Sequence, residues 1–170
     1  DRLYNTNLSI TTLQEIAARL GADVPYCITG KTALATGIGE ILTPLPEIPK
    51  CTILMVKPPI NVSTAAIYEA IDNVAIDARP DTQAMIDALK TQDINAVANN
   101  LSNVMGKVTE SMYPIVRGIR NKMLLNGALG AVMSGSGPTV FGIFPDYETA
   151  KKSHDSFYYQ FREVYVVSTI

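Results

Sequence analysis

A loop rich in serine and glycine lies between two short apolar runs, and it restricts the local fold more than any other feature of the chain. The apolar runs, residues 131–134 and 139–144, have the length and composition of β-strands. The loop contains Ser134, Gly135, Ser136 and Gly137. A strand–loop–strand arrangement differs from the dinucleotide fingerprint and the Walker loop, because both of those lead into a helix. The pattern predicts a connection between two strands of one sheet.

The composition of this loop is compatible with two uses that the residues alone leave open. Glycine adopts positive φ angles easily, so Gly135 and Gly137 let the backbone approach a ligand or another loop closely. Ser134 and Ser136 add hydroxyl groups, and such a turn can direct successive N–H groups at an anion. A tight β-connection that binds no ligand is the alternative.

Size and charge exclude several classes of protein. The chain has 170 residues, of which 47% are hydrophobic and 18% charged, as in an ordinary soluble protein with one core and an appended piece. It has no apolar run of about 18 residues or more and no secretion signal, so no membrane partner is expected. A net charge of −2 argues against a nucleic-acid partner, which needs a basic face.

The cysteines and the histidine do not indicate a metal site. Cys27 and Cys51 lie in apolar runs, where free cysteines usually act as small core residues. With His154 as the single histidine, a zinc site would lack ligands, and His154 itself is expected to pack against the face of a helix. A reducing, cytoplasmic setting fits best. Because the chain starts at Asp1 without a methionine, we expect a processed product or a piece of a longer protein.

Residues 1–49 are expected to form the first of two parts of the chain. We predict a helix that begins with a capping box at Thr12 and Glu15 and ends at Gly21, followed by a loop over residues 21–25. Short strands are expected at residues 32–36 and 40–45, before a stiff connection formed by Pro44, Pro46 and Pro49.

Residues 50–170 are expected to form an α+β domain of the ferredoxin-like, split β-α-β type. Strands are predicted at residues 52–57, 131–134, 139–144 and 163–168. Helices are predicted after caps at Ser63 or Thr64, Asp81 and Asp93, from Pro114, and over residues 147–159, with a loop at residues 74–80. The helix capped by Asp93 is expected to reach Met105. This order predicts an antiparallel sheet with helices packed on one face.

Three further residues are candidates for chemistry. Asp23 lies in a proline-bounded bend, which suits a carboxylate that accepts or orients a hydroxyl proton, although an Asp that bonds its own turn is the alternative. Thr64 and Tyr68 are four residues apart on a predicted helix, and together they could hold a flat polar ring. A capping threonine and a half-buried tyrosine are the alternative for that pair.

Four segments together resemble one family of small-molecule kinases. They are LGADVPYCITG at residues 20–30, TALATGIGE at 32–40, VKPPINVSTAAIY at 56–68 and MSGSGPTVF at 133–141. In this order they resemble the 4-diphosphocytidyl-2-C-methyl-D-erythritol kinases, which belong to the GHMP kinase superfamily. The glycine motif alone indicates only the superfamily, and the Asp-Val-Pro and Pro-Pro-Ile segments narrow the resemblance to this family.

The resemblance implies a role for each candidate residue. Asp23 matches the family's catalytic aspartate, Tyr68 matches an aromatic residue that stacks on cytosine, and Thr64 matches a substrate-side hydroxyl. The loop at residues 134–137 matches the motif that supports the phosphate region. The implied reaction transfers the γ-phosphoryl group of ATP, with Mg²⁺ bridging phosphates, to the 2-hydroxyl group of a cytidyl diphosphate substrate in isoprenoid precursor synthesis.

The chain departs from the family pattern at its N-terminal side. The family's Gly/Ser-rich phosphate loop and the lysine that pairs with the catalytic aspartate do not occur here. We therefore expect a C-terminal portion of the kinase that lacks the phosphate loop. Residues 1–49 would be a remnant of the N-terminal lobe that carries the Asp-Val-Pro segment, and residues 50–170 the C-terminal domain. We expect it to expose apolar surface, to self-associate (for example as a homodimer) or be partly disordered near residues 1–45, and not to turn over ATP alone. Two alternatives stay open. They are a non-catalytic ferredoxin-like module that binds a ligand or partner, and another GHMP kinase acting on homoserine or a mevalonate derivative.

Overall fold

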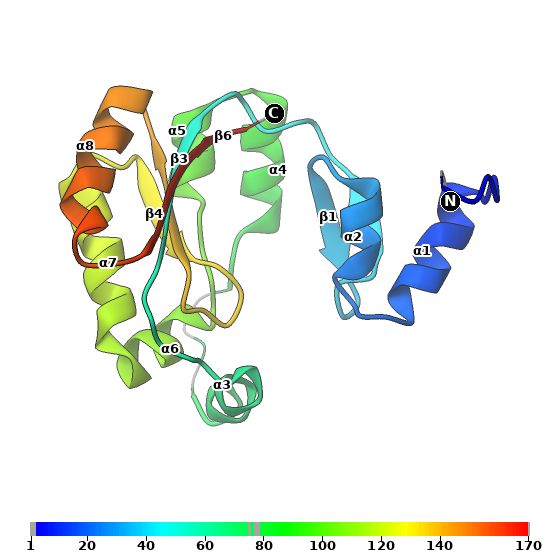
Figure 1. Cartoon of the computed structure of the whole chain (residues 1–170), viewed down its shortest axis with the longest axis horizontal. Coiled ribbons are helices and arrows are strands. Elements are labelled where there is room, and N and C mark those ends of the chain that lie inside the picture. The colour runs from blue at the N-terminus through cyan, green and yellow to red at the C-terminus, as the bar shows by residue number, and fades with distance from the viewer. Residues whose placement is uncertain (1–2, 75, 77–78, 170) are drawn as a thin grey trace. The chain divides into compact units, whose positions relative to one another are not determined.

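The computed structural model describes residues 3–74, 76 and 79–169, and it divides into two compact units (Figure 1). Unit 1 is Asp1–Ile48 and unit 2 is Pro49–Ile170. The predicted loop at residues 74–80 falls partly outside the described residues, which omit 75, 77 and 78. No helix in the described ranges has both the length and the apolar character needed to cross a bilayer.

Unit 1 consists of two short helices and a hairpin. The helices are α1 (Ile10–Ala18) and α2 (Val24–Thr29), and the hairpin pairs β1 (Ala33–Thr36) with β2 (Ile41–Pro44) in antiparallel register. The predicted strands are thus confirmed. The predicted capping box is wrong, because Ser9 caps α1 and accepts a hydrogen bond from the Thr12 N–H at 3.1 Å.

The helix α2 was not predicted, and it changes the interpretation of Cys27. The predicted loop ends at Asp23, and Pro25 lies in the first turn of α2, where its fixed φ angle suits a helix and its missing N–H costs nothing. Cys27 is exposed on this helix, so the prediction of a core cysteine is wrong there. Cys51 is half-buried, and burial raises the pKa of its thiol.

Unit 2 contains a four-stranded antiparallel sheet with the strand order β4-β5-β3-β6. The strands are β3 (Thr52–Lys57), β4 (Gly130–Met133), β5 (Val140–Phe144) and β6 (Glu163–Ser168). The chain order β3, helices, β4, β5, α8, β6 gives the split β-α-β topology that the sequence predicted. The sheet is centred on β3, where Leu54 is opposite Gly142 on one side and Val166 on the other.

The helices of unit 2 begin mostly where the sequence places a cap. They are α3 (Thr64–Ile71), α4 (Thr82–Lys90), α5 (Ile94–Asn99), α6 (Gly106–Met112), α7 (Pro114–Leu125) and α8 (Tyr147–Tyr158). Asp81 and Asp93 each accept a hydrogen bond from a backbone N–H of the first turn, as predicted. Of the two predicted candidates at the start of α3, Ser63 is the cap and Thr64 is the first helical residue. The predicted continuation of one helix from Asp93 to Met105 is wrong.

That helix stops early because asparagine side chains compete for its backbone. The Asn100 side chain donates to the Ala96 carbonyl at 2.9 Å and closes α5. Asn103 then accepts the Met105 N–H at 2.9 Å, and a separate helix, α6, follows at Gly106. Residues 100–105 therefore form a non-helical connection beside the sheet.

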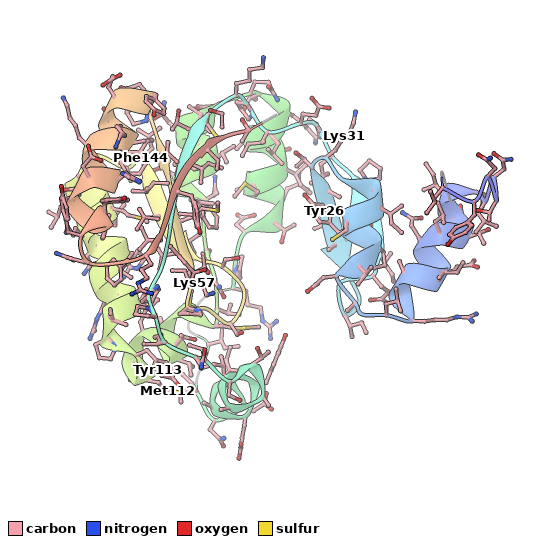
Figure 2. The ribbon with its side chains drawn as sticks, in the orientation of Figure 1. Tyr26, Lys31, Lys57, Met112, Tyr113 and Phe144 are labelled. Carbon is pink, nitrogen blue, oxygen red and sulfur yellow. The ribbon has the colours of Figure 1, made fainter. Side chains whose placement is uncertain are left out.

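The main core lies between one face of the sheet and the helices α7 and α8, which lie on the same side of it (Figure 1). Phe144, which is labelled in Figure 2, belongs to this core together with Val56, Met123 and Phe157. The second face is partly covered near β4, because a Cβ atom at Gly130 would lie 2.3 Å from the Ala98 carbonyl oxygen of α5. The expectation of helices on one face only is therefore wrong at the β4 edge.

Candidate functional site

The serine–glycine loop joins β4 to β5 in the predicted way. Its backbone requires glycine at two positions, since φ is 56° at Gly135 and 92° at Gly137. Inside the loop, the Ser134 N–H donates to the Thr139 carbonyl at 2.8 Å, and the Gly137 N–H donates to the Ser134 carbonyl at 2.9 Å. These bonds form a compact turn at the end of the hairpin.

Side chains from two other segments hold the remaining carbonyl groups of the loop. The Asn103 side-chain amide donates to the carbonyls of Met133 and Gly135, each at 2.8 Å. The buried Thr109 hydroxyl donates to the Ser136 carbonyl at 3.2 Å. As a result, the carbonyl groups of residues 133–136 all accept hydrogen bonds from within the protein.

The N–H groups of the loop are in the opposite situation. Within the described ranges, the N–H groups of Gly135 and Ser136 donate to no protein acceptor. The loop thus offers free donors while its carbonyl oxygens are occupied. Consecutive backbone N–H groups of this kind bind anions such as phosphate, which is the first of the two uses that the sequence left open.

The start of α3 is bonded to this loop. The hydroxyl groups of Thr64 and Ser136 lie 2.9 Å apart, so a hydrogen bond joins two residues that are 72 positions apart in the chain. Tyr68 is one helical turn further along α3, and its side chain is 54% exposed. The structure therefore brings Thr64 to the loop and leaves the Tyr68 ring accessible to a ligand.

Lys57 is the last residue of β3, and its side chain is paired with a residue of the neighbouring strand β6. Its ammonium group lies 3.1 Å from Glu163 of β6, which is its cross-strand partner (Lys57 is labelled in Figure 2). The side chains are 45% and 43% exposed, so this ion pair contributes little to stability. In this structure the Lys57 ammonium group is paired with Glu163.

A pocket of about 470 Å³ opens beside the loop and was not anticipated from the sequence. It lies between α4, the 100–104 connection and the second face of the sheet. The side chains that give it its apolar character are Met85, Leu101, Val132 and Phe141, and Ser134 and Gly135 form part of its rim. The pocket combines apolar walls with a polar edge, as ligand sites commonly do.

Asp23 belongs to unit 1, whereas Thr64, Tyr68 and the loop belong to unit 2. It occupies the N-cap position of α2, but its side chain makes no capping bond, and in the described part of the chain its carboxylate has no hydrogen-bond donor. A Cβ atom at Gly39 would lie 3.2 Å from Asp23 Oδ1, so the carboxylate faces the turn between β1 and β2. This argues against the alternative that Asp23 bonds its own turn.

The His154 side chain contacts other side chains of its own helix, α8. Its Nδ1 lies 2.9 Å from Asp155, and its ring centroid is 5.5 Å from that of Tyr158. Hydrogen bonds from Lys151 and His154 hold the pKa of Asp155 below its usual value. The described residues contain no group of three or more His, Cys, Asp or Glu side chains that could enclose a metal ion.

Sequence reasoning found the loop and the helix beside it but missed Asn103 and Thr109. Asn103 was placed inside a helix, and its contacts reach residues 30 and 32 positions further along the chain. The one available signal was the density of asparagine around residues 99–103, which disfavours helix continuation.

Comparison with known proteins agrees with this arrangement. The family model "GHMP kinases C terminal" matches residues 85–162. The 4-diphosphocytidyl-2-C-methyl-D-erythritol kinase of Lachnospira eligens is 48% identical over 149 residues, which cover 88% of this chain and 52% of the relative. The kinase of the same name from Alkaliphilus oremlandii is 45% identical over 170 residues, covering 99% of this chain and 58% of the relative.

Solved structures give the same result. A 4-(cytidine 5′-diphospho)-2C-methyl-D-erythritol kinase superposes with a TM-score of 0.80 at 25% identity, over 98% of this chain and 59% of that one. Homoserine kinase from Cytophaga hutchinsonii superposes with a TM-score of 0.73 at 18% identity, over 99% of this chain and 60% of that one, and shows the shared fold. The chain thus spans little more than half of the length of the two relatives from Lachnospira eligens and Alkaliphilus oremlandii. On these matches, residues 85–162 correspond to the C-terminal domain of GHMP kinases, and nearly the whole chain is similar to part of the 4-diphosphocytidyl-2-C-methyl-D-erythritol kinases.

Proposed function

We propose that this chain is the C-terminal part of an ATP-dependent kinase that phosphorylates the 2-hydroxyl group of 4-diphosphocytidyl-2-C-methyl-D-erythritol. The observation that carries the proposal is the bond between Thr64 and Ser136, which attaches α3 to a loop with free N–H groups. A phosphate-facing loop and an exposed aromatic ring on one small surface suit a ligand that combines a diphosphate with a base. Relatives at 40–48% identity carry that kinase name.

Each candidate residue has a role in this proposal. Tyr68 stacks on the cytosine ring, and Thr64 contacts the substrate from the start of α3. Ser134, Gly135, Ser136 and Gly137 support the phosphate groups, through the free N–H groups of Gly135 and Ser136. Asp23 orients or deprotonates the acceptor hydroxyl, for which an unpaired carboxylate is well suited. Phosphoryl transfer of this kind depends on positioning and charge stabilisation.

The loop offers hydrogen-bond donors for the phosphates of ATP, whereas the described side chains offer no cluster of ligands for Mg²⁺. The N–H groups of Gly135 and Ser136 can donate to phosphate oxygens. For Mg²⁺, the described part of the chain offers no cluster of three or more acidic or histidine ligands. Mg²⁺ commonly keeps several waters and binds one or two carboxylates together with substrate phosphates, so we assign no protein ligand to it. When bound, it would neutralise charge on the transferred phosphate.

Two statements about the setting belong to the same proposal. The thiols of Cys27 and Cys51 are both free, which supports a reducing compartment such as the cytoplasm. Unit 1 exposes large apolar side chains, including Leu20 at 78% and Ile38 at 82%, and these support either coverage by an N-terminal lobe or self-association as a homodimer. Without that lobe, the 170-residue chain is proposed to bind ligand but not to turn over ATP.

Tyr68 distinguishes this function from the alternative kinases, because the acceptor substrates homoserine and mevalonate carry no base on which a tyrosine ring could stack. We expect cytidine 5′-diphosphate to bind the chain, and Tyr68→Ala to weaken binding about tenfold through loss of stacking. Tyr147→Ala is the matched control, since Tyr147 is also helical and its side chain is 55% exposed against 54% for Tyr68. Isothermal titration calorimetry provides the measurement. Equal affinity of Tyr68→Ala and wild type would refute the cytidyl assignment.

A further inference from the structure

Asn103 is the residue that ties the loop to the rest of unit 2 most completely. Its amide nitrogen has two N–H groups, and both are used, on the carbonyls of Met133 and Gly135. Its oxygen accepts the Met105 N–H at 2.9 Å. Because a backbone N–H can only donate, this bond determines which end of the amide faces the loop.

The two bonds to the loop also determine where its N–H groups point. In a trans peptide the C=O and the following N–H point in opposite directions. Holding the Gly135 carbonyl towards Asn103 therefore turns the Ser136 N–H away from Asn103. In the same way, holding the Met133 carbonyl turns the Ser134 N–H away from Asn103, and that N–H donates to Thr139.

No other hydrogen bond among the described residues holds the Gly135 carbonyl or the Ser136 N–H, although the Ser136 hydroxyl is bonded to Thr64. A Cβ atom at Gly135 would meet no other atom within 4 Å, so side-chain packing does not fix the backbone there. Glycine also allows the adjoining peptide to rotate at little cost. Thr109 holds only the next carbonyl, that of Ser136.

We propose that Asn103 is a positioning residue, which keeps the Gly135 carbonyl turned inward and the free Ser136 N–H presented to an anionic ligand. The inference rests on the proposed role of the loop in facing phosphate. In this proposal Asn103 acts through the orientation of the peptide between Gly135 and Ser136. Without its amide, that peptide can rotate and place a carbonyl oxygen where the anion binds.

The test replaces the side-chain amide of Asn103 by a carboxylate and leaves the size of the side chain nearly unchanged. Asn103→Asp keeps the acceptor for Met105 but sets carboxylate oxygen against the carbonyls of Met133 and Gly135. Asn100→Asp is the matched control, because it adds the same charge three residues away and its amide bonds only within its own helix end. Both variants of the 170-residue chain are compared with wild type by NMR.

The first measurement needs no ligand. Residual dipolar couplings of the Gly135 and Ser136 N–H groups report their orientation. We expect the Ser136 coupling to change in Asn103→Asp but not in Asn100→Asp, whereas the Gly135 N–H follows the Ser134 carbonyl, which the Gly137 N–H holds. Unchanged couplings in Asn103→Asp would overturn the inference whatever the loop binds.

The second measurement titrates inorganic pyrophosphate and follows the same two amide signals. We expect both signals to shift in wild type and in Asn100→Asp, and the affinity of Asn103→Asp to fall about tenfold or more. Melting temperatures, measured in parallel, separate a lost orientation from a general loss of stability. Equal pyrophosphate affinity in Asn103→Asp and Asn100→Asp would also overturn the inference. If wild type gives no shift, the phosphate-facing role of the loop is wrong, and the dipolar couplings alone decide the role of Asn103.

Discussion

The two glycines of the loop have different surroundings, although both have positive φ angles. At Gly137, a Cβ atom would lie 2.7 Å from Met133 Sδ and 3.2 Å from Thr109 Cγ2, and both of those residues are buried. At Gly135, a Cβ atom would meet nothing within 4 Å. The first position therefore combines backbone strain with a steric conflict, whereas the second has backbone strain alone.

We expect this difference to appear in stability. Gly135→Ala should lower the free energy of unfolding by about 1 kcal/mol, the typical cost of a left-handed conformation for alanine. Gly137→Ala should lower it by about 2–3 kcal/mol, because a buried neighbour must also move. Urea unfolding followed by circular dichroism measures both. Equal losses in the two variants would show that the space around Gly137 does not matter.

At the scale of elements, the caps illustrate what local sequence can predict. Ser63, Asp81 and Asp93 were identified because a cap is made by a side chain and an N–H group only two or three residues away. The same reasoning failed at Thr12, because Ser9 offers an equally good cap three residues earlier. Local rules identify candidate caps, and the packing of the helix selects among them.

The cap of α8 gives a prediction with a definite pH dependence. Asp146 accepts the Thr149 N–H at 2.7 Å, and this bond holds the pKa of its carboxyl below the usual 3.8. A lowered folded-state pKa means that the stabilisation is complete above the unfolded pKa and is lost as the pH falls through the folded value. Asp146→Ala should therefore lower the melting temperature at pH 7.

The control for this prediction is Asp146→Asn, which keeps an acceptor oxygen but cannot ionise. We expect the difference between wild type and Asp146→Ala to shrink as the pH falls from about 5 to about 2. For Asp146→Asn we expect a smaller deficit at neutral pH that disappears over the same range. A difference between wild type and Asp146→Ala that is constant from pH 7 to pH 2 would contradict the role of the ionised cap.

At the scale of the whole molecule, the two units differ in how much core each contains. Among the described residues of unit 1, Ala17 and Pro25 are the buried ones. Unit 2 has a continuous core that includes Leu54, Phe144 and Phe157. Because burial of apolar surface is the main source of stability, unit 1 should open far more often than unit 2.

Hydrogen–deuterium exchange followed by mass spectrometry tests this expectation. We expect peptides covering α1 and α2 to exchange at least about a hundredfold faster than peptides covering β3 and β5, because local opening free energies range from near zero to the global value. The exposed helix α3 serves as an internal control for a surface element of unit 2. Comparable protection of α1 and β3 would contradict the expectation that unit 1 opens far more often than unit 2.

The alternation of apolar strands with capped helices was enough to predict the split β-α-β order, because strand length, caps and glycine turns are encoded within a few residues. It also placed Thr64 at a helix start with Tyr68 one turn further on the same face, and residues 134–137 between two strands. Tertiary structure alone decided that Thr64 bonds Ser136, that Asn103 and Thr109 hold the loop, and that α5 covers part of the second sheet face. These contacts join positions far apart in the chain, and their formation depends on how the strands and helices pack.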